Sequence, residues 1–377
     1  MPRERRSVVI AYFSVFLGAG VWAPYFPLYL SHLGFHGWQI GTLIGMQPAL
    51  RWGSAVLLAY AADRWRIRHR LLVVTACCGV LCFIPLLVVR DFGTMALVLG
   101  AIALLHGGLI PMLDATVMDH LTGLGGNYGR LRLWGSLAFV LGAAGSAPLI
   151  HLTSPDVVPA LLLLPGIGFV PAFLGLPRGQ LGHGERFHAP WGLLTPPLNA
   201  FLLTAFLLQL SCGAWGGFFA VHTAALGFSD AVPGFTWGLA VTAEIALFYW
   251  ARDVVERVPP TALVTTTLLI TVIRWALTAV TNNEAFVILL QLGHAFTFSA
   301  FHLAALLLLS RLVPPQSTTG GQALYGVVGF GAGGSVGVAL AGWLVDRVGT
   351  AGVFWVEAVI ALVSLVPAFR LRQLVKT

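Results

Sequence analysis

The feature that most constrains this chain is a series of about twelve apolar runs, each long enough to cross a lipid bilayer. A transmembrane helix needs roughly 20 consecutive apolar residues to cross a hydrocarbon core of about 30 Å. The runs are uniformly long and rich in Leu, Ala and Gly, without the alternation of outer-membrane strands. The sequence therefore predicts an all-α polytopic membrane protein with twelve transmembrane helices, centred near residues 19, 50, 79, 106, 141, 166, 212, 241, 269, 298, 333 and 361.

Charged residues are scarce, and their distribution predicts the orientation of the chain. Only 9% of the residues are charged, compared with about 25% in soluble proteins. If the N-terminus is cytoplasmic, seventeen Arg and Lys residues fall in cytoplasmic segments and only Arg90 and Arg347 fall outside. This bias predicts an inner-membrane protein with both termini in the cytoplasm. It also explains the net charge of +7 without a nucleic-acid partner.

The chain lacks the common signatures of processing, metal binding and nucleotide chemistry. Its basic start and first apolar run could be a signal peptide, but the run is long and no A-x-A cleavage pattern follows, so we interpret it as the first transmembrane helix. Cys77, Cys78, Cys82 and Cys212 lie in predicted spans without metal-ligand spacing. No Walker, HExxH or G-x-S-x-G motif occurs. We therefore expect neither an enzyme nor an ATP-driven pump, and no cofactor or metal.

One long polar segment divides the chain into two halves. The sequence PRGQLGHGERFHAP covers residues 177–190, and every other connection is short. We predict a central cytoplasmic loop at 177–192 between six-helix bundles formed by residues 1–176 and 193–377. This layout is typical of transporters built from repeats. An acid beside an Arg also recurs at the ends of the second, eighth and eleventh predicted helices, in residues 59–72, 250–263 and 342–349.

Several of these stretches resemble the major facilitator superfamily. The Asp63–Arg64 turn resembles a degraded copy of its loop-two signature, and residues 342–349, which include Asp346 and Arg347, resemble a better-preserved copy. YGRLRLWGSLAFVLG resembles the helix-five entry of the oligosaccharide and nucleoside proton symporters, including lactose permease. The chain is most similar to 3-phenylpropionate permease-like proteins, also in residues 111–120, 241–250, 272–277, 291–306 and 322–337. The resemblance implies alternating access, with the four named acid and Arg residues acting as a conformational switch.

Charged and polar side chains inside the spans are the candidate functional residues. A charge at the bilayer centre costs about 3 kcal/mol or more, so such residues usually face a cavity or a partner. The charged and polar residues that lie well inside the predicted spans are few. They are Arg51, His106, Asp114, Glu244, Arg274, Gln291, His294, His302 and Glu357.

In the first half, Asp114 and Arg132 lie on predicted antiparallel neighbours and are expected to meet. The resemblance implies that this acid and Arg contact substrate, while a purely structural ion pair stays open as an alternative. Arg51 has no acid within one turn, so its planar fork is a candidate clamp for a carboxylate. A partner such as Asp114 or a backbone carbonyl stays open for Arg51.

In the second half, Glu244, Arg274 and His294 match the acid, Arg and His that couple protons in lactose permease-like transporters. This sequence departs from that pattern because Thr297 stands where a further acid is expected. We therefore assign proton acceptance to Glu244. Burial favours its neutral form and Arg274 favours its ionised form. A fixed buried Glu244–Arg274 pair remains an alternative.

The stretch QLGHAFTFSAFH places polar groups on one predicted helix face. Gln291, His294, Phe298 and His302 follow steps of three, four and four residues, which line one side of a helix. We predict that Gln291 and His302 bind substrate there and that His294 relays protons. Gly329, Gly333 and Gly337 recur every four residues, which indicates close helix packing rather than a dinucleotide site.

These observations predict a monomeric, lipid-embedded transporter that couples protons to the symport of a small aromatic acid. Substrate is expected between Arg51, Asp114 and Arg132 on one side and the second-half residues on the other. Two alternatives remain within transport: a sugar or nucleoside proton symporter, and a drug exporter. A membrane sensor is the alternative of another class.

Overall fold

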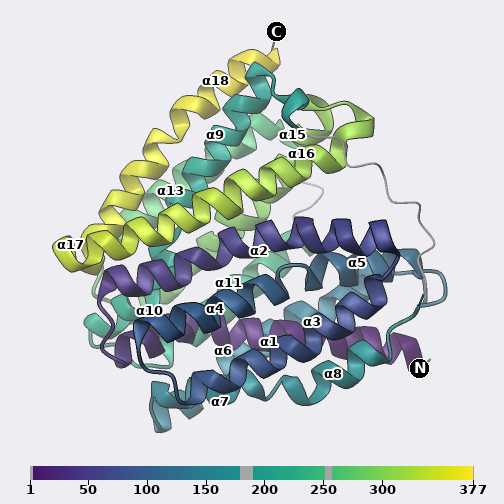
Figure 1. Cartoon of the computed structure of the whole chain (residues 1–377). Helices are drawn as coiled ribbons and strands as arrows, with labels where there is room; N and C mark the ends of the chain where they lie inside the picture. Colours follow the sequence, from purple (N-terminus) through teal and green to yellow (C-terminus); the bar gives the residue numbers. More distant parts are fainter. Residues whose placement is uncertain (1–2, 179–189, 251–256, 377) are drawn as a thin grey trace. The chain divides into compact units, whose positions relative to one another are not determined.

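The computed structural model describes residues 3–178, 190–250 and 257–376 (Figure 1). Within these ranges every regular element is helical. The chain forms two compact units, one from residues 1–35, 46–185 and 233–238 and the other from 36–45, 186–232 and 239–377. The predicted bundles 1–176 and 193–377 stay a prediction, and residues 179–189 of the predicted central loop lie outside the described residues. So do residues 251–256 of the repeated stretch after the eighth helix.

The first unit contains most of the N-terminal helices. They are α1 (Arg3–His32), α3 (Arg68–Phe83), α4 (Phe92–His106), α5 (Leu109–Asp119), α6 (Tyr128–Leu152), α7 (Val158–Leu163) and α8 (Gly166–Leu174), with short 3₁₀ turns at Ile84–Leu87 and Pro155–Val157. Helix α2 (Gly37–Trp65) begins in the second unit and continues in the first. The buried core of the first unit contains side chains of α1, α3, α5, α6 and α8.

The second unit contains the remaining helices, several of which are interrupted. They are α9 (Pro196–Leu210), α10 (Gly213–Ala225), α11 (Val232–Trp250), α13 (Pro260–Val280), α14 (Glu284–Leu290), α15 (Phe301–Leu312), α16 (Thr318–Tyr325), α17 (Gly334–Val363) and α18 (Leu365–Lys376). Residues 233–238 of α11 are assigned to the first unit. A 3₁₀ turn, η4 (Gln291–Gly293), and two π-helices, η5 (Ala295–Ala300) and η7 (Gly326–Gly333), interrupt the predicted tenth and eleventh helices.

The number of spanning segments agrees with the twelve predicted apolar runs. Ten described segments are long and apolar enough to cross a membrane, and one of these, Thr318–Val375, has 58 residues. That segment bends at Gly349, where φ is 69°, and therefore counts as two spans. Helix α2, with 29 residues, adds the last one although it carries Arg51.

Polar side chains set where several helices begin. The carboxylate of Asp91 accepts a hydrogen bond from the Thr94 backbone N–H at 2.9 Å and caps α4. Asn127 caps α6 and Asn283 caps α14 in the same way, each at 2.9 Å. These caps satisfy backbone donors that no helical carbonyl reaches. The hydrogen bonds from Thr94 also hold the pKa of the Asp91 carboxyl below its usual range.

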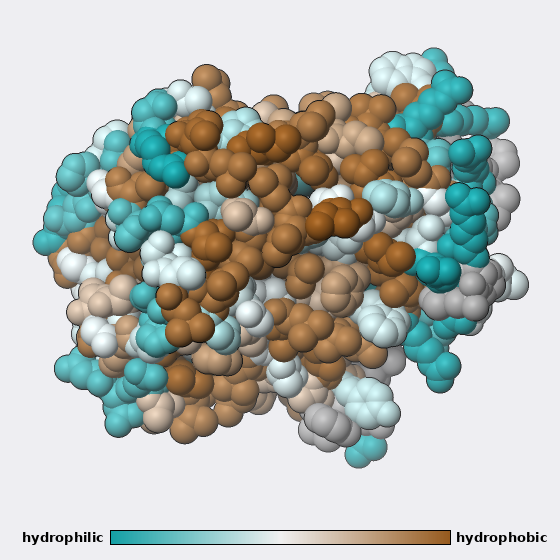
Figure 2. Space-filling view, turned by 90° about the horizontal axis from the view of Figure 1, so that it is seen from below, coloured by the Kyte–Doolittle hydropathy of each residue, from teal (hydrophilic) through white to brown (hydrophobic). Residues whose placement is uncertain are grey.

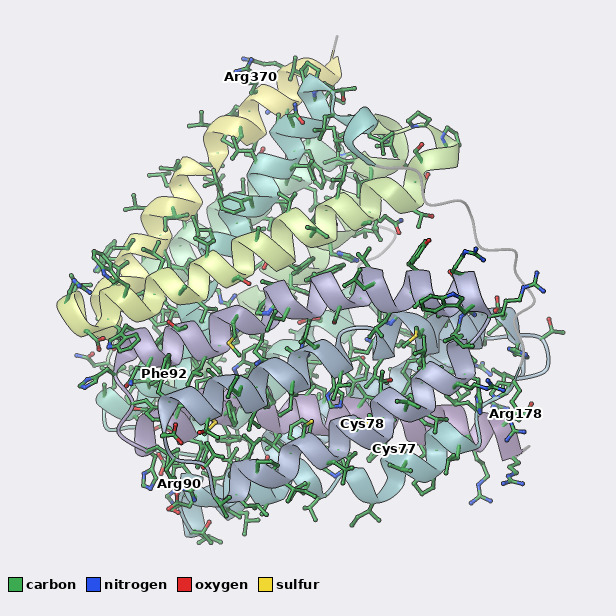
Figure 3. All side chains as sticks on the ribbon, in the orientation of Figure 1. Cys77, Cys78, Arg90, Phe92, Arg178 and Arg370 are labelled. Carbon is green, nitrogen blue, oxygen red and sulfur yellow. The ribbon has the colours of Figure 1, made fainter. Side chains whose placement is uncertain are left out.

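The surface carries the signature of a lipid-facing protein. Much of the face in Figure 2 is apolar, and hydrophilic side chains gather at its margins. Large apolar side chains such as Leu57 and Leu97 are 69% and 75% exposed. Within the first unit, Arg90 and Arg178 lie at opposite ends, with Cys77 and Cys78 between them (Figure 3). Exposed apolar side chains between charged ends fit a bilayer as solvent.

Glycines allow the broken helices of the second unit to approach closely. Gly213 of α10 faces the backbone of Gly337 in α17, and a Cβ on Gly213 would come within 2.6 Å of the Val338 nitrogen. A Cβ on Gly333 would come within 2.6 Å of the Phe206 carbonyl oxygen in α9. The glycine repeat therefore packs helices, as predicted.

We expect Gly213→Ala to destabilise the second unit, because the added methyl group meets backbone that cannot move aside. Overpacking of this kind costs about 1–3 kcal/mol. Thermal unfolding of the purified protein in detergent would report the loss as a lower Tm. Gly216→Ala is the matched control on the same helix, since its Cβ would lie 3.8 Å from Val338 Cγ2. Equal Tm values for the two variants would contradict the packing argument.

Candidate functional site

Arg274 of α13 is the centre of a buried polar cluster in the second unit. Its side chain is 2% exposed, and its guanidinium lies 4.6 Å from the ring centroid of Trp215 and 4.3 Å from that of Trp275. Its Nε donates to Gln291 Oε1 at 2.9 Å, and its Nη2 donates to the same oxygen. A cation held by two aromatic faces and an amide oxygen is stabilised without an acid in direct contact.

His294 lies between Arg274 and Glu244. Its Nε2 is 2.9 Å from Glu244 Oε1, and its Nδ1 is 3.4 Å from Arg274 Nη1. These contacts assign a neutral imidazole that donates from Nε2 to the carboxylate and presents the Nδ1 lone pair to the guanidinium. The alternative of a direct Glu244–Arg274 pair differs from the described contacts, in which the imidazole connects acid and base.

Gln291 and Thr297 hold the arginine in place. Gln291 is fully buried, and its Nε2 donates to the Val287 carbonyl oxygen at 3.2 Å while its oxygen accepts from Arg274. Thr297, at the position where the resemblance implies an acid, has its hydroxyl oxygen 3.4 Å from Arg274 Nη1. The structure thus gives Gln291, predicted as a substrate ligand, a positioning contact with the guanidinium.

The polar stripe around His294 coincides with irregular helix. Residues Ala295–Ala300 form a π-helix, a geometry common at functional sites. The rings of His294 and Phe298 stack at 5.8 Å, and those of Phe298 and His302 stack at 6.2 Å. His302 Nδ1 lies 3.4 Å from the Tyr325 hydroxyl. The predicted face therefore exists, as a ladder of stacked rings that leads from the cluster to Tyr325.

Glu357 is a second buried acid in this unit, which sequence reasoning included among the polar residues without giving it a role. It is 2% exposed, and its Oε1 accepts from the Ala214 backbone N–H in the first turn of α10. Arg274 acts on it electrostatically. An acid in an apolar span was the available signal, but the interruption between α9 and α10 that creates its partner has no clear sequence mark.

In the first unit, Asp114 has a different partner from the predicted one. Tyr12 donates a hydrogen bond from its hydroxyl to Asp114 Oδ1. Arg132 instead lies over the Phe16 ring, 4.0 Å from the centroid, and interacts with Asp114 electrostatically. Among the described contacts the expected Asp114–Arg132 ion pair does not occur. Tyr12 is the residue that sequence reasoning missed, because nothing local distinguishes it from other aromatic residues in the spans.

Arg51 and His106 border one cavity of about 270 Å³ in the first unit. Asp114 and a backbone carbonyl were the predicted alternatives as partners for Arg51. In the part of the chain that the structure describes, neither one is hydrogen-bonded to its buried Nε atom. The Nε atom of Arg51 is therefore left without a side-chain partner among the described residues.

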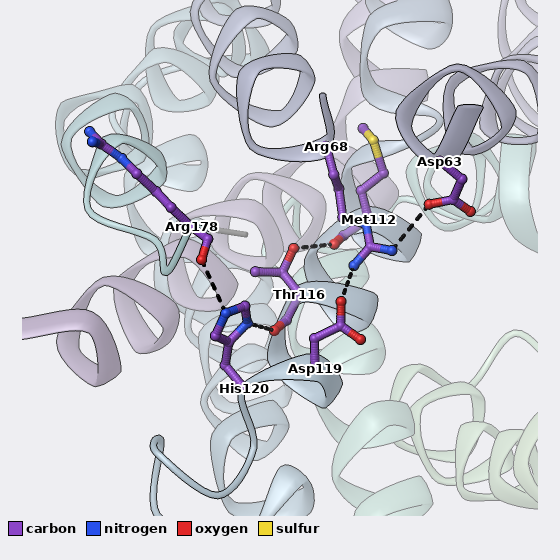
Figure 4. A network of polar contacts seen from close by, with 7 residues as sticks. All are labelled: Asp63, Arg68, Met112, Thr116, Asp119, His120 and Arg178. Atoms are coloured by element: carbon purple, nitrogen blue, oxygen red, sulfur yellow. Dashed lines mark hydrogen bonds and ion pairs between the residues drawn. The ribbon is translucent and has the colours of Figure 1, made fainter. Parts of the chain in front are cut away.

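Of the four predicted switch residues, Asp63 and Arg64 lie at the end of α2, and Asp346 and Arg347 lie just before the bend of α17 at Gly349. Asp63 pairs with Arg68 at 3.1 Å, and Arg68 also binds Asp119 at 2.6 Å (Figure 4), whereas Arg64 is exposed. In the second unit, Asp346 accepts hydrogen bonds from the backbone N–H groups of Gly37 at 2.8 Å and Trp38 at 3.0 Å. Arg347 lies 3.9 Å from the ring centroid of Trp343. Asp346 thus caps the start of α2, where the helix dipole favours negative charge.

A family model described as the MFS_1 like family matches residues 6–356. The chain belongs to this family. It is 29% identical over 369 residues to the probable 3-phenylpropionic acid transporter of Escherichia coli (strain K12), which covers 96% of this chain and 97% of the relative. Maltose permease of Geobacillus stearothermophilus is 24% identical over 340 residues, or 89% of this chain and 86% of the permease.

Solved structures of other transporters share the fold. The nucleoside transporter NupG matches with a TM-score of 0.84 at 16% identity, over 100% of both chains. A bacterial homologue of the lysosomal transporter Spinster matches with a TM-score of 0.74 at 15% identity, over 98% of this chain and 96% of the other. These likenesses confirm the predicted twelve-helix fold of the major facilitator superfamily. This family member is a multi-pass membrane transporter for a small molecule, and not an enzyme.

We expect Gln291→Leu to destabilise the second unit by about 2 kcal/mol, because it leaves a buried guanidinium without its best acceptor. Thermal unfolding in detergent measures the effect. Gln291→Glu keeps an acceptor oxygen at the same place and should lose much less. A Leu variant as stable as the unmodified protein would show that Arg274 does not depend on this amide.

Proposed function

We propose that the protein is a proton-coupled symporter that moves a small aromatic acid across the inner membrane by alternating access. The observation that carries this proposal is the Glu244–His294–Arg274 chain inside apolar spans. Charged groups in such positions are rare and mark ion or proton pathways. The support comes from a carboxylate and an imidazole in direct contact, at 2.9 Å, where water is scarce.

The chemistry of this chain fits the binding of one proton. With Glu244 ionised, His294 donates to it from Nε2 and keeps its Nδ1 lone pair toward Arg274. A proton on Glu244 removes the negative charge beside His294 and weakens the contact between the carboxyl group and Nε2. A proton on His294 instead would place an Nδ1–H against the guanidinium donors. Uptake of a proton at Glu244 would therefore change both the net charge and the contacts of the cluster.

A small aromatic acid is the substrate class that we infer. The relative from Escherichia coli is named a probable 3-phenylpropionic acid transporter, and its similarity extends over 96% of this chain. Arg51 supplies a cation of the kind that binds carboxylates, and its Nε atom has no hydrogen-bond partner among the described residues. Because the chain is also similar to a maltose permease, a sugar is the second candidate substrate. Arg51 favours the acid, because a neutral sugar offers no negative charge to a guanidinium in an apolar span.

The orientation and the switch follow from charge at the helix ends. We infer cytoplasmic termini from the positive-inside bias. Asp63 with Arg64 and Asp346 with Arg347 are proposed to govern alternation between states. For Asp346 the support is its pair of hydrogen bonds to the start of α2. For Asp63 the support is its ion pair with Arg68, which also forms an ion pair with Asp119. We further propose that the protein works as a monomer in the bilayer.

We expect Glu244→Gln to abolish uphill uptake while exchange of labelled substrate across the membrane continues. The amide cannot take up the proton, yet it keeps the size of the side chain. Purified protein in liposomes with an imposed proton gradient measures accumulation, and substrate-dependent change of lumen pH measures the proton.

Glu284→Gln is the control for this experiment, because Glu284 is an exposed acid at the start of α14 in the same unit. That variant should accumulate substrate normally. Survival of uphill uptake in Glu244→Gln would remove Glu244 from the coupling step. Absence of any proton movement with acids, sugars or nucleosides would overturn the symport proposal as a whole.

We expect Asp346→Asn to slow transport without changing the affinity for substrate. Loss of a negative charge at a helix N-terminus costs about 1 kcal/mol, which alters the balance between conformational states. Initial rates in liposomes and a separate binding assay distinguish the two effects. Asp230→Asn in the same unit is the control. A parallel change of rate and affinity would indicate that Asp346 affects binding and is not a switch.

A further inference from the structure

The described residues that line the cavity all belong to the first unit. The volume of the cavity is about 270 Å³, and α1, α2, α3, α4, α5, α6, α7 and α8 all contribute to its lining. Ligand pockets generally measure about 300–1,000 Å³. The space therefore suits a small molecule with one ring rather than an oligosaccharide.

The cavity carries the positive charge of Arg51. Among the described residues that line it, Arg51 is the one with a charged side chain, His106 adds a buried imidazole, and none is acidic. The Nε atom of Arg51 and the Nε2 atom of His106 are buried without a hydrogen-bond partner in the described chain. Arg51 lines the cavity, but its Nε atom is buried and cannot be reached from it. A ligand in the cavity would therefore contact the two terminal nitrogens of the guanidinium. Such a pair of nitrogens matches the two oxygens of a carboxylate.

The rest of the wall is mostly aromatic and apolar. Trp22 meets Phe83 edge to face at 6.2 Å between ring centroids. The His106 ring continues this row, 5.5 Å from Phe83 and 6.0 Å from Phe169. Gly79 makes room for it, since a Cβ at that position would overlap the imidazole. A row of rings around an apolar space favours another ring, through edge and stacked contacts.

We propose that this cavity is a binding site for a small aromatic monocarboxylate, with its carboxylate on Arg51 and its ring against Trp22 and Phe83. The inference rests on the proposed function for its ligand class and places that ligand within the first unit. Polar lining is limited to a few side chains, including Ser14, Arg51 and His106. A sugar would bury many hydroxyl groups there without partners, which disfavours it strongly.

Binding of 3-phenylpropionate to the purified full-length protein tests the site by isothermal titration calorimetry. Arg51→Gln should raise the Kd at least about tenfold, the value expected for loss of a charge-assisted hydrogen-bond pair. Arg51→Lys keeps the charge without the fork and should give an intermediate Kd. Arg70→Gln, at an exposed Arg in the same unit, should bind like the unmodified protein. Equal Kd values for Arg51→Gln and Arg70→Gln would overturn the proposal.

Two further measurements locate the ligand. The neutral analogue 3-phenylpropanol and the ringless propionate should each bind at least about tenfold more weakly than 3-phenylpropionate. A ligand-dependent change in tryptophan fluorescence should shrink in Trp22→Phe while calorimetric binding persists. An unchanged signal in Trp22→Phe, or equal binding of 3-phenylpropanol, would count against the site. Unchanged unfolding temperatures verify that each variant is folded.

The outcomes separate this proposal from the proposed function. Glu244→Gln should bind 3-phenylpropionate normally although it cannot accumulate it. If Arg51→Gln retains both proton-coupled uptake and the affinity for 3-phenylpropionate, the proposed binding site in the cavity is wrong, while the proposed symporter function is retained. Binding that maps to Arg51 and Trp22, without proton movement, would retain the cavity and overturn proton coupling.

Discussion

The constraint on which this structure depends is the lack of water in the hydrocarbon core. Every backbone donor and acceptor there must find a partner within the protein, so the chain crosses as helices. The same constraint acts on charge, because an ion without water needs a protein partner. Arg274 illustrates the solution. Two tryptophan faces, the Gln291 oxygen and the His294 nitrogen replace its hydration.

Polar function and irregular helix occur together. His106 lies at the end of α4, three residues before α5 begins, and Ser211 and Cys212 separate α9 from α10. His294 directly precedes a π-helix, and another π-helix joins α16 to α17. Each interruption frees backbone groups or redirects a side chain, as when the Ala214 N–H at the start of α10 reaches Glu357. Interruptions are tolerated where the freed groups are buried in protein.

Much of the fold and part of the site were predictable from sequence. The spans follow from local composition, and the buried acids and bases follow from being costly in lipid. Partner choice was less predictable. Asp114 was expected to meet Arg132, but Tyr12 from α1 takes its carboxylate, and Arg132 lies on Phe16 instead. Sequence distance carries no information on which of several aromatic residues in another span reaches an acid.

The sequence by itself determined the helical class, the number of spans and the short set of polar residues within them, because each depends on the transfer of local segments from water to lipid. Only the tertiary structure decided that His294 stands between Glu244 and Arg274, and that Arg51 borders a cavity with an aromatic wall. These relations join side chains from different helices. They depend on helix rotation, on interruptions and on glycine contacts such as Gly213 with Gly337, which arise from packing across the whole unit.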